Sequence, residues 1–362
     1  MSEPKDLNST LSGSGRSFLI LAALVIIVAG IKAAQAIMVP FLLAVFLATI
    51  AATPMLWIKR RGVPSGLALT LVVLGIFLAL ALLATLLTQS TSAFSAKLPF
   101  YQERLILIQS NLAGLLGGLG IPVDLSSLAD SLSLSSVLAF AGSTLSSLGN
   151  VLGDGFLILL TVIFILAEVT SFSPKLHAIL ANPDRDVAHF ERIADNINRY
   201  IAIKTSVSIA TGITVTTFLW ILGVDFPVLW GLLALLLNFV PTVGSIFAAI
   251  PPIILALIQL GPSEAGLVGL GFFFVNTVFG NVIEPRYMGR GLGLSTLVVF
   301  LSLIFWGWVL GPVGMFLSVP LTMTGKIALE ANPRTLWLAK LLGPGSESIK
   351  LEPAASSDTE PT

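Results

Sequence analysis

The sequence predicts an all-α integral membrane protein with about eight membrane segments, two of which are interrupted by proline and glycine. The composition supports this fold class, because 55% of the residues are hydrophobic and only 10% are charged, whereas soluble proteins carry about 25% charged residues. The apolar residues fall in long runs, each at or near the roughly 20 residues that a helix needs to cross a bilayer. A soluble globular fold does not suit such a chain.

The apolar runs divide the chain into membrane segments and the loops between them. The expected membrane segments are residues 17–34, 37–58, 65–90, 150–170, 201–222, 228–258, 263–283 and 294–327. The first two are expected to form a helical hairpin that turns near residues 32–35. The expected organisation is a disordered cytoplasmic tail at 1–15, N-terminal membrane helices at 16–90, an external amphipathic segment at 91–149, a membrane helix at 150–170, a cytoplasmic amphipathic helix at 171–200, a transport core at 201–327 and a cytoplasmic tail at 328–362.

Charged residues set the expected orientation and exclude several functions. Lys59, Arg60 and Arg61 follow the second segment, and cytoplasmic loops carry an excess of basic residues, so both termini are expected in the cytoplasm. Basic and acidic residues both number 19, which leaves no excess charge for nucleic acid. The chain has no cysteine, which excludes disulfides and thiolate metal sites, and its only histidines lie in a charged stretch. Neither a metal nor a cofactor is expected.

The segment at 228–258 is too long for one straight span. As a continuous helix it would be about 46 Å long, against a hydrocarbon core of roughly 30 Å. It is interrupted between Asn238 and Gly244, with Pro241 between them, and a proline inside a helix removes a hydrogen bond and clashes with the preceding turn. A re-entrant hairpin with its tip near the membrane midplane is the expected form.

The segment at 294–327 repeats this pattern, with an interruption between Trp306 and Gly314 that contains Pro312. The sequence VGSIFAAIP at 243–251 can be laid beside VGMFLSVP at 313–320. If the first segment enters and leaves on the external side, the next span deposits Arg286 and Arg290 in the cytoplasm, as the positive-inside bias requires. The chain is therefore expected to contain two helix-plus-hairpin units in an inverted repeat, an arrangement found in secondary transporters.

Polar residues within these apolar segments are the candidates for a solute pathway. Asn238 and Thr242 lie at the first interruption, and Asn276 and Asn281 lie in the segment at 263–283. Neutral amides and hydroxyls suit a small polyhydroxylated solute, which needs hydrogen bonds but no countercharge. The alternative is that these residues only hydrogen-bond neighbouring helices.

The motif Glu284-Pro285-Arg286 ends the segment at 263–283, where the proline is expected to stop the helix. Arg286 could cap the last carbonyl groups, pair with Glu284 or bind an anionic or polyol substrate. Gly289 and its neighbouring glycines make the following turn permissive. The full set of candidate pathway residues is Asn238, Pro241, Thr242, Gly244, Asn276, Asn281, Glu284, Pro285, Arg286, Gly289, Pro312 and Gly314.

An ion antiporter would ordinarily need a carboxylate within the membrane. The candidates are Asp154, Glu168 and Glu284, and none lies deep in an expected span, so sodium/proton antiport is the second hypothesis. The chain contains no Walker motif and no catalytic constellation, so neither direct use of ATP nor an enzyme is expected. A membrane scaffold is a third possibility, but it gives no reason for polar interruptions.

Four stretches carry a resemblance to a known family. They are NRYI at 198–201, LGVDFPVLWGLLALLLNFVPTVGSIFAAIPP at 222–252, NVIEPRYMGRGLGLSTLVV at 281–299 and GPVGMFLSVPL at 311–321. They closely resemble the autoinducer-2 exporter (AI-2E, PerM-like) family of bacterial permeases. The resemblance implies a multi-pass inner-membrane transporter and a homo-oligomer, with a pentamer among the candidate assemblies. It also implies export of an autoinducer-2-like solute or, for some members, sodium/proton antiport.

Overall fold

The computed structural model is all-helical throughout the residues it describes, which are 13–118, 154–179, 183–241, 243–288, 293–330, 333 and 335–344. The predicted external segment 91–149 therefore lies outside the described residues from position 119 onward, as do residues 1–12 of the predicted N-terminal tail. The predicted C-terminal tail, 328–362, is described only at 328–330, 333 and 335–344, which include the helix α13. The helices are α1 Gly13–Ala33, α2 Gln35–Arg60, α3 Ser65–Gly118, α6 Gly155–Ile179, α7 Pro183–Ile221, α8 Pro227–Leu237, α9 Val243–Gln259, α10 Pro262–Asn276, the π-helix η2 Thr277–Ile283, α11 Glu284–Met288, α12 Thr296–Glu330 and α13 Leu336–Leu342.

Five helices of the described chain are long and apolar enough to cross a membrane. They are Gln35–Arg60, Ser65–Ile108, Ile197–Ile221, Pro262–Tyr287 and Thr296–Glu330. Each matches one of the eight expected segments. The other three expected segments contain only shorter apolar helices: Leu21–Ala33, Gly155–Glu168, and the pair α8 and α9. The fold class is thus all-α with several membrane-length helices.

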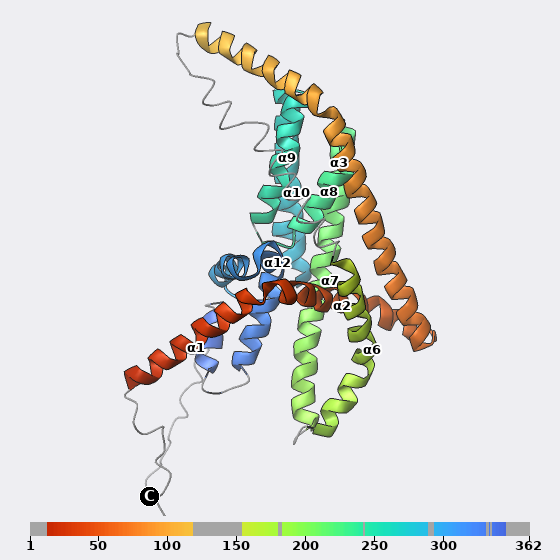
Figure 1. Ribbon diagram of the computed structural model, residues 1–362, viewed down its shortest axis with the longest axis vertical. Coiled ribbons are helices and arrows are strands. Elements are labelled where there is room, and N and C mark those ends of the chain that lie inside the picture. The colour runs from red at the N-terminus through yellow and green to blue at the C-terminus, as the bar shows by residue number, and fades with distance from the viewer. Residues whose placement is uncertain are drawn as a thin grey trace, which may run out of the picture.

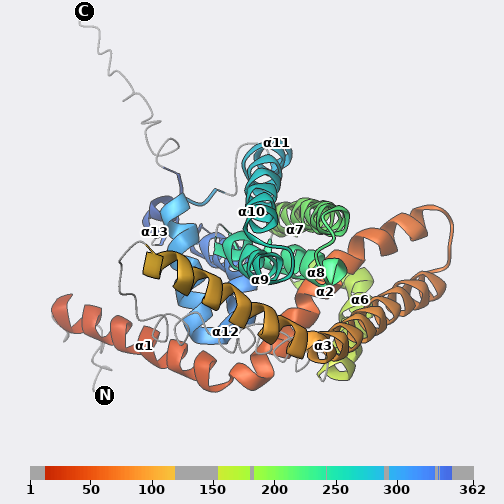
Figure 2. The ribbon, with the colours of Figure 1, turned by 90° about the horizontal axis from the view of Figure 1, so that it is seen from above.

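The N-terminal helices do not form the expected hairpin. Ala34 separates α1 from α2, but its peptide N–H still bonds the carbonyl of Gly30 and its own carbonyl accepts from Met38, so the chain turns a corner without folding back. Figures 1 and 2 show α1 pointing away from α2 at the edge of the molecule. The residues at 32–35 are Lys-Ala-Ala-Gln, all good helix formers with no glycine or proline to reverse the chain.

Two long helices organise the rest of the molecule. α3 has 54 residues and is about 81 Å long at 1.5 Å per residue, and it continues well past the segment expected at 65–90. α7 joins the expected amphipathic helix and the following membrane segment into one helix of 39 residues. Figure 2 shows α7, α8, α9 and α10 as a central group, with α1 and α3 at its periphery. 

Close helix packing in the central group depends on glycine. A Cβ atom on Gly212 of α7 would lie 2.8 Å from the carbonyl oxygen of Gly231 on α8, and a Cβ atom on Gly231 would overlap Thr216. On the other side of α7, the ring of Phe218 occupies the space where a side chain at Gly271 of α10 would lie. α7 is therefore held tightly between α8 and α10.

The first interrupted segment forms two helices joined by a turn. α8 ends at Leu237, residues Asn238 to Pro241 make the turn, and α9 begins at Val243. A Cβ atom on Gly244 would overlap the carbonyl oxygen of Leu237, so α9 starts in direct contact with the end of α8. At the other end, the side chain of Gln259 donates to the carbonyl of Gly223, just before α8. We call α8 and α9 the first helical pair.

The second interrupted segment, α12, folds back at Gly311, whose φ of 68° lies in the left-handed region. In one straight helix the carbonyl of Gly293 and the side chain of Lys326 would be roughly 50 Å apart, yet Lys326 Nζ donates to that carbonyl at 2.7 Å. Trp306 Nε1 likewise donates to Thr322 Oγ1 at 3.0 Å. We call the limbs 296–310 and 312–330 the second helical pair.

The turns of the two pairs approach each other at the centre of the molecule. Phe239, in the first turn, packs on Phe316, just after the second turn, with ring centroids 4.5 Å apart. Phe46 of α2 contacts both rings at 5.6 and 5.0 Å. Figure 1 places α8 and α9 above α12 in the same view. The two interruptions therefore share one aromatic contact.

Candidate functional site

A polar stripe on α7 faces the first turn. Lys204, Ser208 and Thr211 recur at helical spacing, so they share one face of the helix. They are 4%, 0% and 7% exposed. Buried polar side chains within a membrane-length helix are costly and usually mark a functional site.

The turn of the first pair is bound to this stripe. The side-chain amide of Asn238 donates to Ser208 Oγ at 2.9 Å, and both residues are buried. A cavity of about 10 Å³ lies beside this bond. It is lined by the polar residues Thr211, Asn238, Ser245 and Asn276 and by the apolar residues Val215, Ala234, Ala248, Phe272 and Val275.

This cavity brings together two residues singled out from the sequence, Asn238 in the first turn and Asn276 at the end of α10. Its volume is close to the minimum for one water molecule, so the site is closed to any organic solute in this conformation. The hydroxyl of Thr211 is buried without a hydrogen-bond partner. An unpaired hydroxyl beside two amides offers a solute both donors and acceptors.

A buried ion pair lies one helical turn from Ser208. Lys204 Nζ donates to both carboxylate oxygens of Glu284 at 2.7 Å, and the two side chains are 5% and 17% exposed. Each charge makes burial of the other tolerable, because an unpaired charge at this depth would be strongly destabilising. The ion pair joins α7 to the junction between η2 and α11.

The structure corrects the expectation for the Glu284-Pro285-Arg286 motif. Pro285 does not stop the helix, which continues through α11 to Met288. The preceding residues, Thr277–Ile283, form a π-helix. Its turn is wider than that of an α-helix, so it leaves room for the proline ring and tolerates the hydrogen bond that proline, without an N–H group, does not make. Of the three roles considered for Arg286, pairing with Glu284 is not found, because Lys204 takes that carboxylate and Arg286 is exposed.

The remaining candidates from the sequence are spread over the molecule. Gly244 and Gly314 are buried at the two turns and Pro241 is half-buried, whereas Pro312, Asn281 and Pro285 are exposed. Asp154 and Glu168 are exposed at the start and on the side of α6, which packs on α2 and α3, so neither lines the cavity. Thr242 and Gly289 lie outside the described residues.

The sequence interpretation missed the α7 stripe. Its clearest signal was Lys204, a basic residue inside the expected span 201–222, because an ionisable residue in a span suggests a functional site by itself. Ser208 and Thr211 continue the same face, at steps of four and three residues. Averaging hydropathy over the span hides such a stripe.

Comparison with known proteins shows which family this chain resembles. The family model described as AI-2E family transporter matches residues 21–334. The chain is 43% identical over 333 residues to the AI-2 transport protein TqsA of Escherichia coli (strain K12), covering 92% of this chain and 96% of that protein.

Two further relatives extend the similarity. A candidate transport protein of Haemophilus influenzae is 41% identical over 334 residues, covering 91% of this chain and 96% of its own length. YhhT of E. coli K12, also named only as a candidate transport protein, is 40% identical over 331 residues, covering 91% and 95%. These names all describe transport proteins, which fits the expectation that the chain is not an enzyme.

Proposed function

Because this chain belongs to the AI-2E transporter family, we propose that it is a multi-pass secondary transporter that exports a small polar organic solute by alternating access. The observation that carries the proposal is the small cavity at the first turn, where Thr211, Asn238 and Asn276 supply neutral hydrogen-bonding groups. Such groups suit a solute rich in hydroxyl groups, and an apolar wall completes the usual composition of a small-molecule site. Autoinducer-2, named for the relative TqsA, is one candidate.

The proposal includes a membrane arrangement. The first helical pair enters from the external side and the second from the cytoplasmic side, as re-entrant hairpins of an inverted repeat whose tips meet at Phe239 and Phe316. Support comes from the shortness of α8 and α9, with 11 and 17 residues, compared with the roughly 20 of a full span. Both termini are placed in the cytoplasm, in the bacterial inner membrane, and the protein is expected to form a homo-oligomer.

Single-cysteine labelling tests this arrangement, since the native chain has no cysteine. Ser263→Cys should react with a membrane-impermeant maleimide from outside, and Tyr287→Cys, on an exposed residue of α11, from inside. The opposite pattern would show that the first pair crosses the bilayer, and the inverted repeat would have to be abandoned.

Solute counterflow in proteoliposomes tests the site. Asn238→Leu and Asn276→Leu should lower counterflow of a small polyhydroxylated solute at least about tenfold, the effect of losing one to two buried hydrogen bonds. Asp154→Asn and Glu168→Gln are matched controls outside the cavity and should retain it. Normal counterflow in correctly assembled Asn238→Leu and Asn276→Leu proteins would contradict the site.

Sodium/proton antiport is the second candidate, and one observation favours it. The Lys204–Glu284 pair places the carboxylate of one membrane-length helix, 262–287, against the ammonium group of another, 197–221. An imposed sodium gradient that moved protons with no organic solute present, and ceased to do so in Glu284→Gln, would establish this function instead.

A further inference from the structure

We propose that Asp225 is a positioning residue that latches the first helical pair to α3, and that Phe226 is the hinge about which the pair moves to open the cavity. The proposal rests on the proposed function in one respect: it assumes that the cavity at the first turn must open. It concerns the end of the pair opposite that cavity, so none of its residues lines the site described above.

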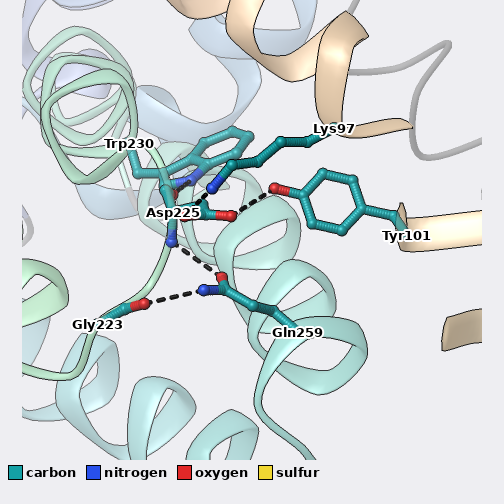
Figure 3. Close-up of polar contacts among 6 residues, drawn as sticks. All are labelled: Lys97, Tyr101, Gly223, Asp225, Trp230 and Gln259. Atoms are coloured by element: carbon teal, nitrogen blue, oxygen red, sulfur yellow. Dashed lines mark hydrogen bonds and ion pairs between the residues drawn. The ribbon is translucent and has the colours of Figure 1, made fainter. Parts of the chain in front are cut away.

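Every polar group of Asp225 is used in contacts with three different segments (Figure 3). Its carboxylate accepts from Lys97 Nζ and from the hydroxyl of Tyr101, both at 2.7 Å. Its peptide N–H donates to Gln259 Oε1 at 3.0 Å, and its carbonyl accepts from Trp230 Nε1 at 2.9 Å. One residue therefore ties α3 to the start of α8 and the end of α9.

The α3 side of this latch is a single helix face. Phe94, Lys97 and Tyr101 lie three and four residues apart, which places them together on one side of α3. Tyr101 is completely buried in the core cluster of the first pair. The ring of Phe94 packs on that of Phe226 with centroids 5.8 Å apart. This part of α3 therefore holds the corner formed by Asp225 and Phe226.

The backbone conformation of Phe226 makes this corner a candidate hinge for the first helical pair. Phe226 is the only residue other than glycine with positive φ in the described part of the chain, at φ 58° and ψ 44°. A bulky side chain in this region is strained and persists only when surrounding contacts hold it. Gly223, three residues earlier, is also left-handed, at φ 75°. A strained residue and a permissive one thus border the latch, as expected of a hinge.

The two bonds of the latch differ in strength. Lys97 is 50% exposed, and exposed ion pairs contribute little. The Tyr101 bond is part-buried, comes from a completely buried phenol and has a charged acceptor, which makes it the stronger of the two. The latch should therefore respond most to loss of the Asp225 charge, less to loss of the Tyr101 hydroxyl and least to loss of Lys97.

Accessibility of the cavity reports directly on the latch. Ala248→Cys places a thiol on the cavity wall, at a residue that is 1% exposed. A separate Glu103→Cys protein, altered at an exposed residue of α3, first shows from which side of the membrane an impermeant maleimide reaches this part of the molecule. The maleimide is then added on that side. In the Ala248→Cys background, Asp225→Asn should raise the labelling rate at least about tenfold, with smaller increases for Tyr101→Phe and then Lys97→Gln.

Three controls separate latch opening from general damage. Glu264→Gln removes a half-buried carboxylate at the start of α10, whose bonded neighbour Ser263 lies outside the latch, and should leave the labelling rate unchanged. Val162→Cys, in the core of α2, α3 and α6, is fully buried and should stay unlabelled in the Asp225→Asn protein. Asp225→Glu keeps the charge and should restore most of the slow labelling. Unchanged labelling of Ala248→Cys in assembled Asp225→Asn protein would overturn the latch.

A cross-link completes the test. The protein carries Lys97→Cys, Asp225→Cys and Ala248→Cys, and a short reducible thiol cross-linker joins positions 97 and 225. The cross-link should return the labelling rate at position 248 to that of the latched protein. Reduction of the cross-link should raise the rate again. Fast labelling despite the cross-link would overturn the hinge. Labelling needs no solute, so a failed latch leaves the counterflow results standing, and a failed solute assignment leaves the latch standing.

Discussion

The two helical pairs share a backbone plan and differ in the side chains at their turns. Gly223 and Gly293 are 70 positions apart in the sequence, both have left-handed φ, and each carbonyl accepts a side-chain donor from the far limb, Gln259 in the first pair and Lys326 in the second. Gly244 and Gly314 are also 70 positions apart. Each lacks room for a Cβ atom against the last carbonyl groups of the preceding limb.

The turns themselves carry different chemistry. The first has an amide, Asn238, bound to a buried hydroxyl and facing a small cavity whose wall is mainly apolar with a few hydrogen-bonding groups. The second is aromatic: Trp306 donates to Thr322, and Lys32 lies 3.9 Å from the centre of the Trp308 ring. The common backbone plan therefore requires glycines and a closing side-chain bond, whereas the polar groups for a solute are concentrated at the first turn.

The largest effect is expected at the charge pair, which belongs only to the region of the first pair. Lys204→Met would leave the carboxylate of Glu284, which is only 17% exposed, without a partner and should lower the free energy of unfolding by about 3 kcal/mol, the lower end of the range for a buried pair. Chemical denaturation in detergent, followed by tryptophan fluorescence, measures this change. The double variant Lys204→Met/Glu284→Gln removes both charges and should recover much of the loss. A double variant as unstable as the single one would mean that packing, and not charge, is responsible.

The tip glycines should show the next largest effect, and here the two pairs should behave alike. Gly244→Ala and Gly314→Ala each force a Cβ atom against backbone, and overpacking of this kind costs about 1 to 3 kcal/mol. Counterflow should fall at least about tenfold in both proteins, because the turns meet at Phe239 and Phe316. Gly325→Ala is the matched control, since it lies in α12 with nothing within 4 Å of a new Cβ atom. Full transport by either tip variant would show that the two turns do not have the same requirement for glycine, which contradicts a backbone plan common to both pairs.

The sequence predicted the local features of this fold better than the long-range ones. The interruptions at Pro241 and Pro312 could be located because proline and glycine act on their own backbone. Asn238 and Asn276 were both chosen as polar residues in apolar segments, and the structure places them on one cavity. The α7 stripe, which bonds Asn238 through Ser208 and adds Thr211 to the cavity wall, could not be placed in the same way, because its role depends on which face of a long helix meets the turn.

Two expectations failed, the first for a reason that is local in the sequence and the second for one that depends on the fold. The turn between α1 and α2 needed a residue that reverses the chain, and Ala34 continues in near-helical geometry instead. Pro285 was expected to end a helix, but the π-helix before it provides a wider turn. Propensity alone cannot forecast such a turn, because tertiary contacts, here the bond from Lys204 to Glu284, also hold it in place.

The smallest effect, and the most discriminating for the comparison, is expected from one hydrogen bond at each turn. Ser208→Ala leaves the Asn238 amide without its partner, and Thr322→Val does the same to the indole of Trp306. Both should lower the free energy of unfolding by about 1 kcal/mol, since each loses a single neutral bond. Counterflow should distinguish them: it should fall several-fold in Ser208→Ala, whose bond orients a residue of the cavity, and stay near the wild-type rate in Thr322→Val. Equal losses of transport in the two proteins would place solute contacts at both turns, and the division between a polar first turn and a structural second turn would be wrong.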